Sequence, residues 1–383
     1  MPTSAGKNLI YRLALPFLAP AVPPHPVLLQ DNRPVVMQKK LTRIIRRNHI
    51  SGGAIAFRSG SEQAVLYTIP FHTETQPGNQ IYYRVASITK MATALVAAVL
   101  IDRGILDPDR PVSALLPGSS DIPELQGICI SELLSHTSGL TDPSGLENKL
   151  LLRVPLRAAV SGCRRPDKSF CYSNLGFGII GCVFESLLGL PVEQIFQEYL
   201  FRPLNLDATL SGITLDINKI MPVKRILPWH ENECIKVTKL GMIPMKEADP
   251  SLHYGYTAGS MYITLQSLIR LTECIRDKGM PLLSGRYSGY MKRKQASYGP
   301  ISPTLSYGKG LLIIRDRRIS GSVIYGHQGF AYGCVDGAFW EESTGNIVVS
   351  LNGGCSEARV GRLGIVNRDL CRFAFREEIP SWK

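Results

Sequence analysis

The chain has 383 residues, of which 44% are hydrophobic and 19% are charged, and it contains 35 Gly and 26 Pro. These values exclude an intrinsically disordered or low-complexity chain and argue against a membrane bundle; the length predicts two or three domains or one large two-lobed unit. The formal net charge is +12, and the first 50 residues hold eight basic groups against one acidic group. A solvated helix face is the plain explanation of this basic segment, with weak contact to an anionic surface as the alternative. No zinc finger, basic zipper or aromatic RNA-binding box indicates a nucleic-acid partner.

Residues 1–35 are rich in proline, which also interrupts a short apolar stretch at 13–22. We expect a leader or flexible arm here, and a signal peptide is disfavoured. No apolar run reaches the roughly 18 residues that span a bilayer. Nine cysteines without a Cys-x-x-Cys pair predict buried thiols in a reducing compartment, although Cys163 and Cys171 can be paired in a bridge. The favoured location is therefore cytoplasmic, with a secreted or cell-envelope location as the alternative.

Secondary-structure patterns divide the rest of the chain into three parts. Residues 37–48 predict a short basic helix, and 52–58 and 64–71 predict strands joined by a Ser-Gly-Ser turn. Residues 87–104 begin at a serine, end at a glycine and are apolar on nearly every side, which predicts a buried central helix. Further helices are expected at 130–134, 175–188, 192–199, 260–277 and about 357–375, and further strands at 311–314, 322–326, 335–340 and 346–351.

This order of elements predicts an α/β (α+β) fold in which both ends of the chain build one antiparallel sheet. Helices from the N- and C-terminal regions flank this sheet, and a mainly helical lobe is inserted between the two groups of strands. We therefore expect one domain over 36–383, with a sheet lobe formed by 36–85 and 305–383 and a helical lobe formed by 86–304. The cleft between the lobes is the expected place for chemistry.

The strongest chemical signal is a Ser-x-x-Lys sequence, of which the chain has three copies, beginning at Ser4, Ser87 and Ser306. Only the second opens a long helix, where the spacing places Ser87 and Lys90 on one face. Burial and the helix dipole both push Lys90 towards its neutral form, which can take a proton from the Ser87 hydroxyl. The Ser87 N–H, at the helix N-terminus, can also help to stabilise an oxyanion. The alternative is a capping serine followed by a lysine that extends to solvent.

Two further motifs supply groups suited to the same site. Tyr172-Ser-Asn174 is the one Tyr-x-Asn sequence in the chain. A tyrosine close to a cationic lysine is expected to lose its proton more easily and to act as acid or base, and the Asn amide can hold a substrate carbonyl. Of two His-x-Gly sequences, only His327-Gln-Gly329 follows an expected strand. Gly329 would let a strand edge approach a ligand closely, and the N–H of Phe330 would complete an oxyanion hole. Taken alone, Tyr172-Ser-Asn174 is explained equally by a loop tyrosine and an ordinary helix-capping Asn.

Together, the three motifs in this order resemble the catalytic segments of the serine β-lactamase-related family. That family includes class C β-lactamases, DD-peptidases, D-aminopeptidases and family VIII esterases. Segments outside the motifs also resemble it, over roughly 40–355: 83–90 (YRVASITK), 106–112 with 115–117, 131–140 (SELLSHTSGL), 203–206 (PLNL), 258–260 (AGS) and 350–353 (SLNG). The resemblance implies a β-lactamase/transpeptidase-like fold and a covalent acyl-enzyme, with no metal or organic cofactor.

The resemblance also implies a role for each matching residue. Ser87 would be the acylated nucleophile and Lys90 its partner, while Tyr172 would share the general-base work with that lysine. Asn174 would bind the substrate amide, and His327 would stand at the first position of the third motif. His136 and Ser138 fall in a block that the resemblance implies is structural, packed under the site.

The third motif departs from the β-lactamase pattern, in which Lys-Thr-Gly is usual. His327 replaces the lysine, as in some DD-peptidases and D-aminopeptidases, and Gln328 replaces the threonine whose hydroxyl helps to hold a substrate carboxylate. A histidine is mostly neutral near pH 7.5, so we expect weaker recognition of a carboxylate. His327 would still be able to donate a hydrogen bond to Tyr172 or to a neutral leaving group.

The predicted function is therefore that of a serine hydrolase that acts on amide or ester bonds through a Ser87 acyl-enzyme. The favoured substrates are D-amino-acid peptides, as for a DD-carboxypeptidase or D-aminopeptidase. An esterase or a β-lactamase is the alternative within enzymes, and a penicillin-binding sensor or scaffold is the alternative without turnover. The expected partners are small peptide, amide, ester or β-lactam substrates.

Overall fold

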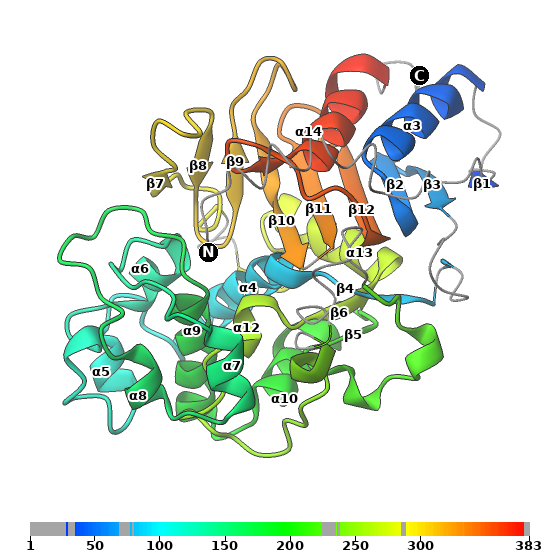
Figure 1. Cartoon of the computed structure of the whole chain (residues 1–383). Coiled ribbons are helices and arrows are strands. Elements are labelled where there is room, and N and C mark those ends of the chain that lie inside the picture. Colours follow the sequence, from blue (N-terminus) through cyan, green and yellow to red (C-terminus); the bar gives the residue numbers. More distant parts are fainter. Residues whose placement is uncertain are drawn as a thin grey trace.

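The computed structural model describes residues 28–29, 35–68, 77–78, 80–223, 235, 238–284, 289–331 and 333–378. Figure 1 shows a broad sheet with two helices on its outer side and a mainly helical lobe packed on the other side. This mixed architecture confirms the predicted fold class. Most of the expected leader, 1–35, lies outside the described residues, and the division into lobes stays a prediction.

The large sheet has nine strands in the order β1-β3-β2-β12-β11-β10-β9-β8-β7, and all of its pairs are antiparallel. Both ends of the chain meet where β12 pairs with β2, with Val349 opposite Ala56. The strands are β1 (Leu28–Leu29), β2 (Ser51–Ser59), β3 (Glu62–Thr68), β7 (Ala296–Ser297), β8 (Leu305–Tyr307), β9 (Leu312–Ile314), β10 (Ile324–Ala331), β11 (Cys334–Glu341) and β12 (Ile347–Gly354). The predicted sheet from the two chain ends is thus confirmed.

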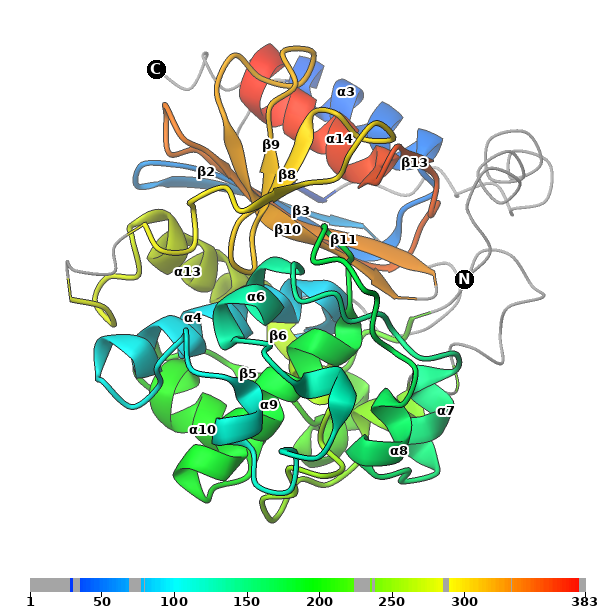
Figure 2. The ribbon, with the colours of Figure 1, turned by 90° about the vertical axis from the view of Figure 1, so that its left-hand side faces the viewer.

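Alternation along the strands gives this sheet two apolar faces. On β11, Val335 and Phe339 face the outer helices, whereas Ala338 and Trp340 face the helical lobe. The outer helices are α3 (Val35–Arg47) and α14 (Ile365–Arg372), which continues as η8 (Phe373–Glu378). Figure 2 shows α3 and α14 side by side on this face, opposite the lobe that contains α4 and α9.

The helical lobe is built around α4, in which every residue from Thr89 to Ile101 is buried. The prediction of a buried central helix is therefore confirmed. The other helices are η1 (Ala86–Ile88), α5 (Val112–Leu115), η2 (Pro123–Leu125), α6 (Ile130–Ser135), α7 (Leu146–Leu151), α8 (Leu156–Val160), α9 (Asn174–Leu188), α10 (Val192–Phe196), η3 (Gln197–Phe201), η4 (Gly212–Thr214), η5 (Ile217–Lys219), α12 (Tyr256–Gly259) and α13 (Leu265–Arg276). A small sheet is formed by β4 (Tyr82–Arg84), β6 (Tyr262–Thr264) and β5 (Ala208–Thr209), and β4 leads directly into η1, which contains Ser87.

Three predicted elements were wrong in their extent. The helix expected over 260–277 begins only at Leu265, because 262–264 is the central strand of the small sheet. The helix expected from 357 begins at Ile365, after a hairpin of β13 (Arg359–Val360) and β14 (Leu363–Gly364). The strand expected over 322–326 continues as β10 to Ala331, because its glycines remain paired with β11. For β6 the reason is that its partners β4 and β5 are distant in sequence, so local patterns do not reveal the strand.

All eight cysteines within the described ranges are free thiols, so Cys163 and Cys171 do not form a bridge. In the same ranges, no group of three or more His, Cys, Asp or Glu side chains could hold a metal ion.

No single described helix has the length and apolar character to cross a membrane. One bent pair, Asn174–Leu188 with Val192–Phe201, meets those criteria jointly, by length and composition only.

Candidate active site

The candidate nucleophile lies in a tight turn between the small sheet and α4. Ser87 is the central residue of η1, and Ala86 before it has φ of 46°, in the left-handed region that residues with a Cβ rarely adopt. The Thr89 hydroxyl closes the turn by donating to the Ala86 carbonyl over 2.6 Å. The same hydroxyl accepts a hydrogen bond of 3.1 Å from the Met261 N–H. The small sheet therefore holds Ser87 in place while leaving its side chain partly exposed.

Lys90 is fully buried, and its Nζ donates three hydrogen bonds. They go to Ser87 Oγ at 3.1 Å, to Asn174 Oδ1 at 2.8 Å and to the Ala258 carbonyl at 2.7 Å. Burial lowers the pKa of Lys90 to about 7, and the nearby negative charge of Asp142 offsets part of that effect. An amine with this pKa is substantially neutral at neutral pH, when it can accept a proton from Ser87.

Tyr172 and Asn174 come to the site at the start of α9. Ser173 caps this helix, because its Oγ accepts from the Gly176 N–H at 3.0 Å. The Tyr172 ring lies under Lys90, with Nζ 4.9 Å from the ring centroid. Burial raises the pKa of Tyr172, and a hydrogen bond with Ser87 opposes that rise only in part. The expectation that the neighbouring lysine makes this tyrosine acidic is therefore wrong: desolvation of the phenolate dominates, and Tyr172 holds its proton at rest.

His327, on β10, faces the site as a neutral ring. Burial lowers its pKa to about 3, and the positive charge of Lys90 acts in the same direction. Its Nδ1 donates to the Gln328 carbonyl at 2.7 Å, because a carbonyl can only accept. Its Nε2 therefore accepts from the Tyr307 hydroxyl at 2.9 Å. Both nitrogens are engaged, so the structure contradicts the expectation that His327 donates to Tyr172 or to a leaving group.

Gly329 allows β10 to lie directly against the nucleophile turn. A Cβ at this position would stand 2.2 Å from the Val85 carbonyl oxygen and 3.3 Å from the Ala86 Cβ. The close approach that Gly329 permits is therefore to the turn that contains Ser87, and the approach of a ligand stays a prediction. Phe330 follows Gly329 on β10, and the Arg359 guanidinium lies 3.7 Å from the centroid of its ring.

His136 packs under these residues, as predicted. Its ring centroid lies 4.3 Å from that of Tyr172 and 4.8 Å from that of Tyr307. Its Nδ1 accepts from the Ser173 N–H at 3.1 Å, and burial lowers its pKa well below the ordinary value. His136 is therefore a neutral packing group that also holds the start of α9.

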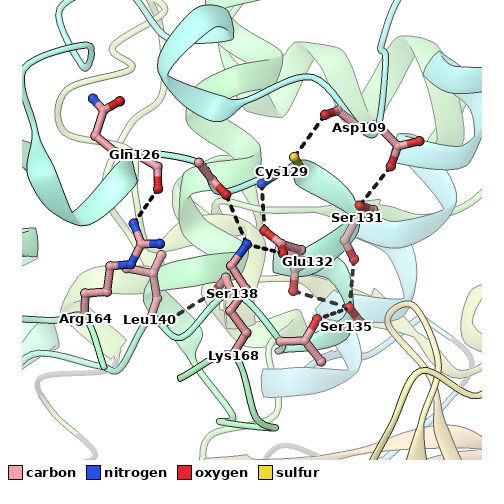
Figure 3. A network of polar contacts seen from close by, with 12 residues as sticks. Asp109, Gln126, Cys129, Ser131, Glu132, Ser135, Ser138, Leu140, Arg164 and Lys168 are labelled. Carbon is pink, nitrogen blue, oxygen red and sulfur yellow. Dashed lines mark hydrogen bonds and ion pairs between the residues drawn. The ribbon is translucent and has the colours of Figure 1, made fainter. Parts of the chain in front are cut away.

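A polar network around α6 fixes the loop that carries His136, and Figure 3 shows it from close by. Glu132 accepts from the Cys129 N–H at 3.0 Å and from Lys168 Nζ at 2.5 Å. Ser131 donates to Asp109 at 3.2 Å, and the Ser131 carbonyl accepts from Lys309 Nζ at 3.1 Å. The lysine of the third Ser-x-x-Lys copy thus supports α6 and lies outside the candidate site. The first copy, at Ser4, lies outside the described residues.

The structure therefore brings together the side chains of Ser87, Lys90, Tyr172, Asn174 and His327 and the backbone of Gly329. The role of the Phe330 N–H in an oxyanion hole stays a prediction. It also adds groups that the motifs did not indicate: Asp142, Tyr307, Arg359 and the Ala258 carbonyl. Asp142 comes two residues after the 131–140 block, and this position is the one sequence signal that could have marked it. Ala258 begins the 258–260 segment that also resembles the family, whereas Tyr307 and Arg359 lie at positions that no motif connects with the site.

Known proteins similar to this chain identify its family. A family model described as Beta-lactamase matches residues 37–350. The D-alanyl-D-alanine-carboxypeptidase/endopeptidase AmpH of Escherichia coli (strain K12) is 29% identical over 170 residues, which cover 40% of this chain and 44% of that protein. Penicillin-binding protein 4* of Bacillus subtilis (strain 168) is 25% identical over 197 residues, which cover 47% of this chain and 42% of that protein. The matched part is thus less than half of either relative's length.

Among solved structures, the D-amino acid amidase from Ochrobactrum anthropi SV3, complexed with L-phenylalanine amide, superimposes with a TM-score of 0.68. The identity is 22%, and the match covers 88% of this chain and 96% of that one. At this identity the likeness shows a shared fold. Because the family model spans most of the chain and the fold agrees with it, the chain belongs to the beta-lactamase family.

Proposed function

We propose that this protein is a serine hydrolase that cleaves amide or ester bonds through an acyl-enzyme on Ser87. The observation that carries the proposal is the contact of 3.1 Å between Lys90 Nζ and Ser87 Oγ, in a buried setting that lowers the lysine pKa to about 7. A serine hydroxyl is a weak nucleophile unless a base close to it accepts its proton. Lys90 meets both requirements, since it is close and partly neutral.

In the proposed acylation, Ser87 Oγ attacks the substrate carbonyl carbon while its proton passes to neutral Lys90. The N–H groups of Ser87 and Phe330 stabilise the oxyanion that forms. As the C–N or C–O bond breaks, Tyr172 gives its hydroxyl proton to the leaving group and recovers one from Lys90. Water then attacks the ester and loses a proton to Lys90 by way of Tyr172. Lys90 passes this proton to Ser87 Oγ, which leaves as the alcohol as the C–O bond to the acyl group breaks.

The proposed substrates are D-amino-acid amides, peptides or short esters that place no carboxylate beside His327. This histidine is neutral and both of its ring nitrogens are engaged, so it offers no cation to a carboxylate. The names of the relatives favour D-amino-acid chemistry, since one is a D-alanyl-D-alanine-carboxypeptidase/endopeptidase and a protein of similar fold is a D-amino acid amidase. A β-lactamase or an esterase remains the alternative enzyme, and a penicillin-binding sensor would be acylated without turnover.

The nucleophile can be identified by covalent labelling. We expect a fluorophosphonate probe to modify Ser87 alone, because this is the serine that lies beside a buried lysine. Mass spectrometry of peptides from the labelled protein locates the adduct, and Ser87→Ala should abolish labelling. An adduct at Ser4 or Ser306, with Ser87 unmodified, would refute the assignment.

The substrate class can be tested by comparing kcat/KM for D-amino-acid amides, short nitrophenyl esters and the β-lactam nitrocefin. We expect the best neutral substrate to exceed nitrocefin by at least roughly 10-fold, which is about 1.4 kcal/mol of transition-state binding. His327→Lys should narrow the gap by restoring a cation. Efficient hydrolysis of nitrocefin by the wild type, without turnover of amides or esters, would instead identify a β-lactamase.

Arg359 favours a second candidate, a DD-carboxypeptidase that binds the free carboxylate of an acyl-D-Ala-D-Ala peptide. Its guanidinium lies against Phe330, and its charge is close enough to lower the pKa of Tyr172. Gln328 holds the hairpin that carries Arg359, donating to the Arg362 carbonyl at 2.7 Å and accepting from the Gly364 N–H at 3.0 Å. If this candidate is correct, the free peptide is cleaved faster than its C-terminal amide, and Arg359→Gln removes the preference.

A further inference from the structure

Asp142 accepts hydrogen bonds from three consecutive residues at the start of α9. Its Oδ1 accepts from the Ser173 hydroxyl at 3.0 Å and from the Leu175 N–H at 2.9 Å. Its Oδ2 accepts from Asn174 Nδ2 at 2.8 Å. The backbone N–H and the hydroxyl of Thr141 both donate to the Cys163 carbonyl, at 2.7 and 3.1 Å, so the loop that carries Asp142 is itself held.

We propose that Asp142 is a positioning residue for the hydrolysis: it keeps the amide oxygen of Asn174 turned towards Lys90, so that neutral Lys90 directs its lone pair at Ser87. This inference rests on the proposed function, because it assigns a base role to Lys90. The hydrogen bonds of Asp142 go to residues 173–175, so it acts on Lys90 through Asn174.

The number of N–H donors on Lys90 decides where the lone pair of its neutral form points. The ammonium form has three N–H donors, and the structure offers three acceptors: Ser87 Oγ, Asn174 Oδ1 and the Ala258 carbonyl. The neutral amine keeps two donors and gains one lone pair. If two donors remain on Asn174 and Ala258, the lone pair points at Ser87 Oγ, where it is needed to accept a proton.

The Ala258 carbonyl is held by the backbone, because Thr93 Oγ1 donates to the neighbouring Thr257 carbonyl at 2.7 Å and Thr257 Oγ1 donates to the Phe177 carbonyl at 2.6 Å. Asn174, by contrast, could present either end of its amide to Lys90. With its NH₂ group turned inwards, it would donate to the lone pair of the lysine and block proton transfer.

A carboxylate prevents that rotation because it only accepts hydrogen bonds. Asp142 can bind the NH₂ end of Asn174 but not the oxygen end, so the oxygen must face Lys90. The NH₂ group has a second hydrogen, which stays available to a substrate carbonyl. An amide at position 142 would lose this discrimination, since it can bind either end.

The charge of Asp142 also acts on Lys90, raising its pKa against the effect of burial. The other titratable groups around Lys90 are neutral at rest: His136 and His327, whose pKa values burial lowers, and Tyr172, whose pKa burial raises. Asp142 is therefore the source of negative charge whose removal should shift the titration of Lys90.

The first test is the variant Asp142→Asn, for which kcat and kcat/KM are both measured against pH on the best substrate. We expect the plateau of kcat to fall by about 10-fold or more, because part of the population holds Asn174 in the wrong orientation. The acidic limb of the kcat/KM profile should move to lower pH, because Lys90 loses a compensating charge. A plateau within twofold of the wild type would overturn the inference.

The second test exchanges the two groups in Asp142→Asn/Asn174→Asp. The new carboxylate at 174 can only accept hydrogen bonds, so Lys90 again donates to residue 174. The hydrogen bond between 142 and 174 remains but runs in the opposite direction, from the amide at 142 to the carboxylate at 174. We expect the double variant to recover part of the kcat that Asp142→Asn loses. Its KM should rise, because residue 174 no longer offers an N–H to a substrate carbonyl. Its acidic limb should lie above that of the wild type, because the charge now contacts Lys90. A double variant no faster than Asp142→Asn would contradict the inference.

Ser173→Ala is the matched control, because it removes another contact of Asp142 and the cap of α9 while leaving the line from Asp142 to Lys90 intact. It should lower the midpoint of thermal unfolding and keep kcat within about threefold. If Ser173→Ala loses as much kcat as Asp142→Asn, the effect is a disturbed helix end and the inference fails. If the wild type itself neither hydrolyses the substrates nor reacts at Ser87, the proposed function fails first.

Discussion

Lys90→Met and Tyr172→Phe should each lower kcat by at least roughly 10²-fold, the low end for lost acid–base catalysis. Lys90 contacts Ser87 Oγ at 3.1 Å, and Tyr172 shares a hydrogen bond with the same hydroxyl, so both side chains handle the same proton. The double variant should therefore be little worse than either single variant. Independent roles would instead multiply the losses to about 10⁴-fold, and that result would contradict a shared proton-transfer unit.

The wild-type pH profile belongs to the same prediction. Lys90 is active when neutral, so kcat/KM should rise with pH through about 7, the value to which burial lowers its pKa, and level off above it. A limb near the ordinary lysine pKa of about 10.4 would show that Lys90 is not desolvated in solution.

Lys309→Met is the matched control for Lys90→Met, because Lys309 is a second largely buried lysine, and its Nζ supports α6. It should reduce thermal stability and leave kcat within about tenfold.

Gly329→Ala should cause a loss of similar size without removing any chemical group. The added Cβ would stand 2.2 Å from the Val85 carbonyl, which accepts the Ile88 N–H at 3.1 Å and so closes the turn around Ser87. The turn and β10 must separate, and a displacement of about 1 Å at reacting groups can lower the rate by about 10²-fold. We expect kcat to fall by that factor, with a loss of stability of about 1–3 kcal/mol from overpacking.

Gly321→Ala provides the control for this substitution, because nothing lies within 4 Å of a Cβ at that position. Its kcat and unfolding temperature should match those of the wild type. The rate of fluorophosphonate labelling separates the possible causes, since it reports on Ser87 without a natural substrate. Unchanged labelling and turnover in Gly329→Ala would show that β10 does not constrain the nucleophile turn.

The central helix, the three candidate motifs and the assembly of one sheet from both chain ends could be predicted from the sequence. The helix could be predicted because its thirteen consecutive buried residues, Thr89 to Ile101, are mostly apolar and include one charged residue, a lysine. The motifs could be found because Ser87 and Lys90 are close along the chain, where helical spacing fixes which face they share. The short strands β4, β5 and β6 could not, because each is stable only against partners far away in sequence.

The protonation states and hydrogen-bond partners of the site residues could be seen only in the tertiary structure. The acceptor of Lys90 at Ala258 lies 168 residues away, and the Tyr307 hydroxyl that occupies His327 lies on a different strand. Burial, which no local pattern measures, reverses the expected behaviour of Tyr172, because removing water from a phenolate outweighs a nearby cation. Asp142 could not be identified from the motifs, because it lies 32 residues from Asn174 along the chain. The fold brings its carboxylate within hydrogen-bonding distance of that side chain.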